Sequence, residues 1–457
     1  MNTRPELAGQ RAVIVGLGRE GRDLARFLAR SGALVHVTDS RPEEALAVDL
    51  TALAELPLGY TLGGHAVHDL DTADVVYVSP GVPPEIPFLL EARQRGIRIS
   101  SATELFFHYC PGTILGITGS SGKSTTTAMT GKVLQAAGRD AVIGGNIGVP
   151  MLGLLDRISE QTLVVMELSS FQLESLMMSP PIATVTNITP NHLDRHVTMD
   201  AYIRAKSQIL DHQSPGNWAI VNRDDPESQR LKVHGHKLQF SQREPVLGAF
   251  QAGSELHINL GNGTHTVCSR HAIQLRGEHN VANALAVIAT AAAAGIDSDA
   301  IRHGIEAFRA LPHRLEPVGE IAGVTYFNDS IATSPERSIA ALESFGEPMV
   351  LLAGGRDKYL PMDHWAAVIQ RRAHHLVVFG EAAPLIRQAA ISAGIPASRI
   401  SEAMALEDAV DAAVRVAHPG DVVLLSPGCT SYDAFFDFEE RGERFRQLVT
   451  QHAGDKT

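Results

Sequence analysis

Two glycine-rich segments of different kinds constrain this 457-residue chain more than any other feature. The first, GLGREG at 16–21, lies between an apolar run, RAVIVG, and an amphipathic stretch, GRDLARFLARSG. The second, GITGSSGKST at 116–125, also follows an apolar run, TILGIT. A glycine turn between a strand and a helix directs backbone N–H groups and a helix N-terminus toward one point, where an anion can bind. The sequence therefore predicts two separate phosphate-binding turns.

The rest of the chain repeats the same strand-and-helix alternation. Short β-branched runs alternate with helical stretches, as in parallel sheets covered by helices. A chain of 457 residues exceeds one hydrophobic core. Turn residues in HYCPGT, and a restart of the alternation near LPHRLEPVG, mark two boundaries. We predict an α/β protein of three domains, over residues 1–111, 112–312 and 313–457: Rossmann-like, P-loop ATPase-type and Rossmann-like, respectively.

Composition excludes several classes of protein. The formal charge of −12 argues against a broad nucleic-acid surface, which needs clustered Lys and Arg. No apolar run matches a signal peptide or a membrane span. Three widely spaced cysteines indicate neither a disulfide framework nor a zinc site. We expect a reduced cytoplasmic enzyme that binds neither nucleic acid nor membrane.

The first glycine segment alone has two interpretations. The G-x-G-x-x-G spacing, with Asp39 closing the next apolar run, is typical of a turn that binds NAD, with the acid on a ribose. The same spacing also occurs in strand-to-helix turns that bind nothing. An NAD-dependent oxidoreductase is therefore one hypothesis, but it leaves the second segment unexplained.

The second segment is more specific. Lys123 and Ser124 follow Gly122 directly, so the lysine can reach β- and γ-phosphates and the hydroxyl can reach Mg²⁺. The segment departs from the strict P-loop because Ile117 stands where the first glycine belongs. A P-loop kinase or GTPase and a nucleotide sensor without chemistry are the alternatives.

With its shifted glycine, TGSSGKST resembles the ATP loop of the Mur ligase family. Further matching segments follow in order: ELSSFQL, TPNHLDRH, AYIRAKSQI, GEHNVANALA, LPHRLE, NDSIATS, AGGRDK and LSPGCTSYDAFFDFEERG, with GLGREGRDLARFL and VSPGVP extending the match through the first domain. The resemblance implies that the first glycine turn holds a UDP-sugar rather than NAD, and that the second holds ATP. Folylpolyglutamate synthases share the ATP loop but lack such a first domain.

The resemblance also implies the reaction. A monomeric ligase would use ATP and Mg²⁺ to join D-glutamate to UDP-N-acetylmuramoyl-L-alanine through an acyl phosphate, in peptidoglycan precursor synthesis. A carboxylate must then approach a polyphosphate, so the site needs cations and N–H dipoles. The expected catalytic residues are Lys123, Glu167, His192, Lys206, Arg314 and Asp329.

The resemblance assigns the remaining site residues by ligand. Those expected at ATP are Gly119, Ser120, Ser121, Gly122, Lys123, Ser124, Thr125, Asn280, Asn283, Arg314, Asp329 and Lys358. Those expected at the UDP-sugar or the amino acid are Leu17, Gly18, Arg19, Asp39, Ser79, Pro80, Gly81, Asn146, His192, Thr333, Ser431 and Phe438. Those expected at metal are Ser124, Glu167, His192 and a carbamylated Lys206.

From the residues alone, several of these positions have simpler explanations. Glu167 ends an apolar run, as a metal-binding acid at a strand tip does. His192 and His196 read as two loop histidines, Lys206 as an exposed helix lysine, and Asn280 and Asn283 as helix-capping residues. For the histidine at 192, for Lys206 and for the two asparagines, only the resemblance favours a functional role.

One position departs from the family pattern. NDSIATS has Ile331 where a lysine commonly lies beside the incoming glutamate. Isoleucine cannot pair with a carboxylate, and one lost charged hydrogen bond costs about 1.5–3 kcal/mol if uncompensated. Arg337 or Lys358 could supply the charge, and addition of L-glutamate remains an alternative. Asp437 also replaces a common Asn.

Overall fold

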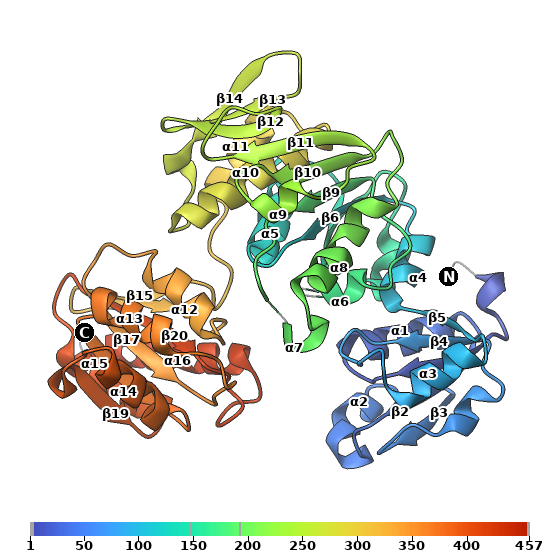
Figure 1. Ribbon diagram of the computed structural model, residues 1–457, viewed down its shortest axis with the longest axis horizontal. Helices are drawn as coiled ribbons and strands as arrows, with labels where there is room; N and C mark the ends of the chain where they lie inside the picture. Colours follow the sequence, from blue (N-terminus) through green and yellow to red (C-terminus); the bar gives the residue numbers. More distant parts are fainter. Residues whose placement is uncertain (1–3, 147–148, 192, 455–457) are drawn as a thin grey trace. The chain divides into compact units, whose positions relative to one another are not determined.

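The computed structural model describes residues 4–146, 149–191 and 193–454. Its strands form three sheets of five, nine and six strands (Figure 1). The first two sheets share one compact unit, which runs to Ile273 and includes Val281–Phe308; the third forms a second unit, Gln274–Asn280 and Arg309 onward. The predicted α/β fold is confirmed, whereas the three domain boundaries stay predictions. No helix among these residues is long and apolar enough to cross a membrane.

The first sheet has the parallel strand order β3-β2-β1-β4-β5. Because β1 is paired with β2 on one side and β4 on the other, the carboxyl ends of β1 and β4 form a topological switch point, where open α/β sheets bind ligands. Helices α1 and α4 pack on one face and α3 on the other. The strands are β1 (Arg11–Val15), β2 (Leu34–Asp39), β3 (Leu58–Leu62), β4 (Val75–Val78) and β5 (Arg98–Ser100), and the helices are α1 (Arg19–Arg30), α2 (Ala47–Thr51), α3 (Pro87–Gln94) and α4 (Ala102–Tyr109).

The second sheet has the order β14-β13-β12-β11-β10-β9-β6-β8-β7, with antiparallel pairing only at β12–β13–β14. Strand β6 is flanked by β8 and β9, so their carboxyl ends lie together. The strands are β6 (Thr113–Thr118), β7 (Ala141–Gly145), β8 (Leu163–Glu167), β9 (Ile182–Val185), β10 (Trp218–Asn222), β11 (His236–Ser241), β12 (Gly248–Ala252), β13 (Glu255–Asn259) and β14 (Thr264–Ser269). The helices are α5 (Lys123–Ala136), α6 (Ser170–Leu173), α7 (Leu193–His196), α8 (Met199–Asp211), α9 (Pro226–Gln229), α10 (Glu278–Ala293) and α11 (Ser298–Ala307).

The third sheet has the order β15-β16-β20-β17-β18-β19, parallel except for β15. Two apolar clusters cover its faces, one with α12, α13 and α14 and the other with α15 and α16. The strands are β15 (Glu316–Ile321), β16 (Val324–Asn328), β17 (Met349–Gly354), β18 (His375–Phe379), β19 (Ile400–Ala403) and β20 (Val422–Gly428), and the helices are α12 (Pro335–Leu342), α13 (Asp363–Arg372), α14 (Ala383–Ser392), α15 (Leu406–Val416) and α16 (Phe438–Gly454).

The first two sheets share a core. One apolar cluster includes Leu24 of α1, Phe106 of α4, Leu152 after β7, and Ile114 of β6. Burial of such side chains contributes about 1.5–3 kcal/mol each. The glycine turn of the first sheet is therefore fixed relative to the P-loop of the second by packing within one unit.

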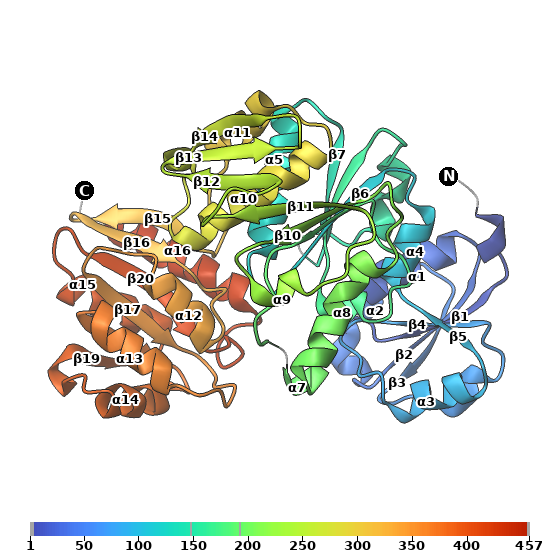
Figure 2. The ribbon, with the colours of Figure 1, turned by 45° about the horizontal axis from the view of Figure 1, so that its top comes forward.

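The packing of α11 on α5 depends on a glycine. The two helices lie side by side (Figure 2), and a Cβ built at Gly304 would stand 2.4 Å from Val133 Cα. We expect Gly304→Ala to destabilise the chain by about 1–3 kcal/mol, because backbone cannot yield to an added methyl group. A lower urea midpoint would show this. Gly216→Ala, where a Cβ meets nothing within 4 Å, is the control, and equal midpoints for the two variants would contradict the expectation.

Candidate active site

The glycine turn of the first sheet is closed by backbone contacts. Gly16 has φ +95°, and a Cβ at Gly21 would stand 2.1 Å from Gly16 O, so both positions require glycine. Ser79 Oγ donates to Gly16 O at 2.7 Å. Leu17 and Gly18 precede the first residue of α1, Arg19, whereas Pro80 and Gly81 follow β4 with Ser79. The expected UDP-sugar residues of this turn thus gather at the switch point.

Asp39 holds this turn rather than facing a ligand freely. Its Oδ2 accepts from the Leu17 N–H at 2.7 Å, and both oxygens accept from Arg41. Burial opposes ionisation of Asp39, but the Arg41 guanidinium and two backbone N–H groups outweigh burial and lower its pKa to about 2. The carboxylate that the NAD hypothesis needs for a ribose is already occupied.

The P-loop lies between β6 and α5. Gly119 and Gly122 have φ +153° and +79°, and Gly122 is the N-cap of α5. Lys123 Nζ donates to Gly119 O at 2.7 Å and to Ser120 O at 3.2 Å. Ser124 and Thr125 follow in the first turn of α5. The ammonium and the helix N-terminus therefore lie at the same loop, as phosphate binding requires.

Residues that the sequence analysis did not single out hold the P-loop in shape. Asn187 Oδ1 accepts from Ser121 N at 3.0 Å and its Nδ2 donates to Ser121 O at 3.1 Å. Tyr202 of α8 shares a hydrogen bond of 3.0 Å with Ser120 Oγ. Asn187 comes two residues after the buried strand β9, just as Glu167 is the last residue of the buried strand β8, and that position was the available signal.

Lys206 is buried, so its interpretation as an exposed helix lysine is wrong. Only 1% of its surface is accessible, because α8 packs on the sheet beside the P-loop. Its Nζ donates to Gly119 O at 2.8 Å and lies 4.7 Å from the Tyr202 ring centre. Burial, with the neighbouring Lys123 charge, lowers the pKa of Lys206 well below its ordinary value. A neutral amine is therefore favoured at this position.

Glu167 has the environment of a cation ligand. It is 1% exposed at the end of β8, and Asn146 Nδ2 donates to its Oε1 at 2.8 Å. Its Oε2 is buried and has no hydrogen-bond partner among the described residues. A buried carboxylate oxygen without a donor is costly unless a cation satisfies it. The residues present thus fit Mg²⁺, although the described residues contain no cluster of three metal-ligating His, Cys, Asp or Glu side chains.

Of the two histidines of TPNHLDRH, only His196 is described by the structure, because His192 lies outside the described residues. His196 is buried, shares a 3.0 Å hydrogen bond with Ser170 Oγ, and stacks on Phe171 with ring centres 5.4 Å apart. His196 is therefore a packed core residue next to α6.

The asparagines of α10 are both buried but contact different groups. A Cβ at Gly122 would stand 2.3 Å from Asn283 Oδ1, so this amide lies directly against the P-loop. Asn280 Nδ2 donates to Arg276 O at 2.7 Å. Asn283 therefore lies where a nucleotide on the loop would meet it.

In the second unit, Asp329 lies at the end of β16. Its Oδ2 accepts from Ser426 Oγ at 2.9 Å and its Oδ1 from the Leu315 N–H at 3.2 Å. Burial raises the pKa of Asp329 to about 7, although these hydrogen bonds and the nearby Arg314 charge favour ionisation. The Arg314 charge therefore lies near enough to Asp329 to favour its ionised form against burial.

Two cations flank Ile331. Arg337 Nη1 donates to Ile331 O at 3.2 Å, and Lys358 Nζ donates to Thr333 Oγ1 at 3.4 Å. Arg337 and Lys358 are exposed, so both can reach a ligand at this edge. Positive charge therefore surrounds the position where the family pattern has a lysine.

Arg441 of α16 holds the loops at one edge of the third sheet by hydrogen bonds. It is fully buried, and its guanidinium donates to Ser330 Oγ at 3.0 Å and to the carbonyls of Ser330, Cys429 and Thr430 at 2.9–3.3 Å. Burial lowers its pKa to about 10, so it stays charged at neutral pH. Ser330 Oγ also donates to Phe438 O at 2.8 Å. Arg441 thus ties the loops that carry Asp329, Ser431 and Phe438.

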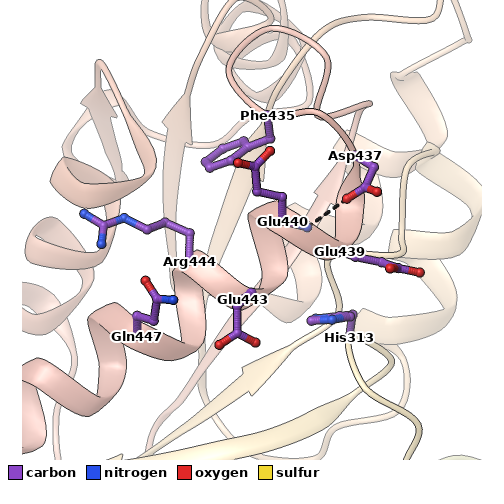
Figure 3. A pocket seen from close by; sticks show the side chains of 8 residues that line it. All are labelled: His313, Phe435, Asp437, Glu439, Glu440, Glu443, Arg444 and Gln447. Carbon is purple, nitrogen blue, oxygen red and sulfur yellow. Dashed lines mark hydrogen bonds between the residues drawn. The ribbon is translucent and has the colours of Figure 1, made fainter. Parts of the chain in front are cut away.

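A shallow pocket beside α16 is acidic. Four carboxylates and one arginine line it, and Glu440 N donates to Asp437 Oδ1 at 2.8 Å (Figure 3). Its lining residues are His313, Phe435, Asp437, Glu439, Glu440, Glu443, Arg444 and Gln447. Because like charges repel, this pocket does not suit glutamate, and the cations near Ile331 suit it better.

We call the hydrogen bonds from buried Arg441 to the loops around it the Arg441 clamp, and replacing Arg441 tests it. We expect Arg441→Lys to lower the urea stability of the chain, because an ammonium cannot reproduce the guanidinium fork, and each acceptor left unsatisfied costs about 1–3 kcal/mol. Arg444→Lys is the matched control on the same helix, since the Arg444–Glu407 ion pair is exposed and worth only about 0–1 kcal/mol. Equal destabilisation by the two changes would contradict the clamp.

Comparisons with known proteins agree with this geometry. Three family models match successive parts of the chain: "Mur ligase MurD-like, N-terminal domain" over 10–101, "Mur ligase middle domain" over 117–291, and "Mur ligase, glutamate ligase domain" over 313–429. A UDP-N-acetylmuramoylalanine–D-glutamate ligase of Roseiflexus sp. is 43% identical and covers 97% of this chain and 99% of its own length. The protein of the same name from Pelotomaculum thermopropionicum is 38% identical over 96% and 97%.

Solved structures show the same fold. The UDP-N-acetylmuramate-alanine ligase of Thermotoga maritima has a TM-score of 0.61 at 18% identity, covering 96% of this chain and 99% of its own. With three family models in order and relatives aligned over nearly the full length, the chain belongs to the Mur ligase family.

Proposed function

We propose that this chain is an ATP-dependent ligase that joins D-glutamate to UDP-N-acetylmuramoyl-L-alanine, releasing ADP and phosphate, in peptidoglycan precursor synthesis. One observation carries the proposal: the side-chain nitrogens of two lysines, Lys123 and Lys206, donate to the same carbonyl, Gly119 O, in a P-loop. A kinase or GTPase needs the first lysine but has no use for the second. The names of the relatives support the substrates.

The three sheets take different parts of the reaction in this proposal. The glycine turn at Gly18 and Arg19, with Ser79 and Asn146, holds the UDP-sugar, while the P-loop holds ATP. The third sheet supplies Arg314, Asp329 and Lys358 to ATP and Thr333, Ser431 and Phe438 to glutamate. The proposed domains are 1–111, 112–312 and 313–457. A cytoplasmic location and a monomeric state stay predictions.

The chemistry has two steps. A carboxylate oxygen of the UDP-sugar attacks the γ-phosphorus of ATP, the bond to the β-phosphate oxygen breaks, and ADP leaves. The glutamate amine then attacks the acyl carbon, the carbon–oxygen bond to phosphate breaks, and the amine loses its proton as phosphate leaves. Lys123 and the N-terminus of α5 stabilise charge on the transferring group, an effect of the oxyanion-hole type.

Glu167, Ser124, Lys206 and His192 would hold Mg²⁺. When bound, the ion neutralises phosphate charge. Lys206 suits this role only after its amine reacts with CO₂, which gives a carbamate with oxygen ligands that a hard cation prefers. The suppressed pKa supports this, because only the neutral amine reacts.

Substrate choice is tested by phosphate release from ATP with UDP-N-acetylmuramoyl-L-alanine and either D-glutamate, L-glutamate or no amino acid. We expect release with D-glutamate, as the names of the relatives indicate, with Arg337 and Lys358 supplying the positive charge that Ile331 lacks. L-selective release would assign the variant specificity. Release independent of the UDP-sugar would refute the ligase function.

The control for this assay is a pair of lysine changes in α5. Lys123→Ala should lower kcat about 10²–10³-fold, as loss of one transition-state donor does. Lys132, whose Nζ donates to Gln135 at 3.0 Å further along α5, should tolerate alanine.

Carbamylation of Lys206 has a direct readout. In isotopically labelled bicarbonate, we expect one carbamate resonance by carbon NMR, absent from Lys206→Arg and present in Lys132→Ala. An active, magnesium-loaded enzyme with an unmodified Lys206 amine would show that the carbamate is not required.

A further inference from the structure

Helix α1 carries two acids that reach beyond the first sheet. Glu20 and Asp23 are three residues apart and therefore lie on one helix face. Glu20 Oε1 accepts from Gln172 Nε2 at 2.8 Å, and Asp23 accepts from the Gly153 N–H at 3.1 Å. Glu20 lies within the glycine segment 16–21, but none of the roles assigned above falls on Glu20 or on Asp23. Both contacts join the first sheet to segments of the second.

Hydrogen bonds to Ser169 hold both the side-chain oxygen and the backbone N–H of Gln172. Its side chain is 3% exposed, and its Oε1 accepts from the Ser169 N–H at 2.9 Å and from Ser169 Oγ at 3.0 Å, while Ser169 Oγ accepts from the Gln172 N–H. These bonds form the capping box of α6. With its carbonyl oxygen committed, the amide has its NH₂ group directed to Glu20. Ser169 stands two residues after Glu167.

We propose that Glu20 and Gln172 form a positioning link that couples UDP-sugar binding at the first glycine turn to the placement of Glu167 at the end of β8. This inference rests on the proposed function, because it takes both ends as parts of one reaction. Glu20 is the second residue of α1, whose N-terminus would face the diphosphate. A shift of that turn would pass through Glu20, Gln172 and Ser169 to the phosphoryl-transfer centre.

The surroundings of Glu20 predict that the affinity for the UDP-sugar depends on pH. Burial raises the pKa of Glu20 to about 7, against the Gln172 hydrogen bond and the Arg19 charge, and Asp23 raises it further. The groups that line the adjoining cavity from α4, from the ends of β7 and β8 and from the turn after β7 carry no charge, among them Thr103, Phe106 and Met166.

A diphosphate at the start of α1 would favour the protonated form of Glu20 further, because like charges repel. Binding then takes up a proton. Affinity for the UDP-sugar should thus be highest below pH about 7 and fall as pH rises through that value.

The link is separable from simple attachment of the two sheets. Asp23 makes a comparable contact from the same face of α1, but its partner Gly153 does not adjoin Glu167. Asp23→Ala is therefore a matched control: it removes a contact between the sheets and leaves the path to β8 intact.

The test uses the full-length chain and four variants: Glu20→Ala, Gln172→Ala, their combination, and Asp23→Ala. Calorimetry gives Kd for the UDP-sugar, and steady-state kinetics give kcat and the KM for ATP. We expect each single variant to weaken UDP-sugar binding and lower kcat by about 10-fold, as loss of one hydrogen bond to a carboxyl group does, and the combination to be no worse than either. Asp23→Ala should lower urea stability without lowering kcat.

The conservative variant Glu20→Gln supplies the second readout. A glutamine retains an acceptor for Gln172, so kcat should stay near wild type, while the fall in UDP-sugar affinity between pH 6 and 8.5, about 3-fold or more for the wild type, should disappear. Independent, multiplying effects of Glu20→Ala and Gln172→Ala, or an equal loss of kcat in Asp23→Ala, would overturn the link. A wild type that turns over no UDP-sugar would instead overturn the proposed function.

Discussion

The carbonyl oxygen of Gly119 accepts hydrogen bonds from the side-chain nitrogens of two lysines, and the candidate site depends on this contact. Two like charges at one acceptor repel, so one of them must lose its charge or gain a counter-charge. The buried lysine, Lys206, is the one whose pKa falls, while Lys123 starts α5 and stays near the phosphate position. The contact thereby assigns different chemistry to two residues of the same type.

Two buried ionisable side chains elsewhere are hydrogen-bonded to neutral oxygens and amides. Arg441 is held by a serine hydroxyl and four carbonyls, and the carboxyl group of Glu20 by a glutamine amide. Such groups satisfy a charge without cancelling it. They therefore leave the positive charge of Arg441 in place at the strand ends of the third sheet. In both places the buried charge also fixes loops that carry candidate site residues.

Much of the fold could be predicted from sequence, because parallel strands covered on both faces read as short apolar runs before glycine turns. The runs that end at Val15, Thr118 and Glu167 became strands with the expected residues at their carboxyl ends. The site was less accessible to sequence reasoning. Lys206 looks like a surface helix lysine because one residue does not reveal which helix face is buried. Tyr202 and Arg441 act through partners far away in the chain, and no local pattern identifies them.

At position 331 the residue type differs from the family pattern, and positive charge comes instead from side chains at other positions. The family pattern supplies positive charge from that position, whereas here Arg337 donates to the Ile331 carbonyl and Lys358 to Thr333. Arg337 comes from α12, which follows the same strand, β16, as Ile331, whereas Lys358 comes from the loop after β17. Exposed side chains such as Arg337 and Lys358 would fix the position of a ligand less tightly than a lysine at position 331 itself. Selection of the amino acid can therefore change without disturbing Asp329, which stays anchored by Ser426 within the sheet.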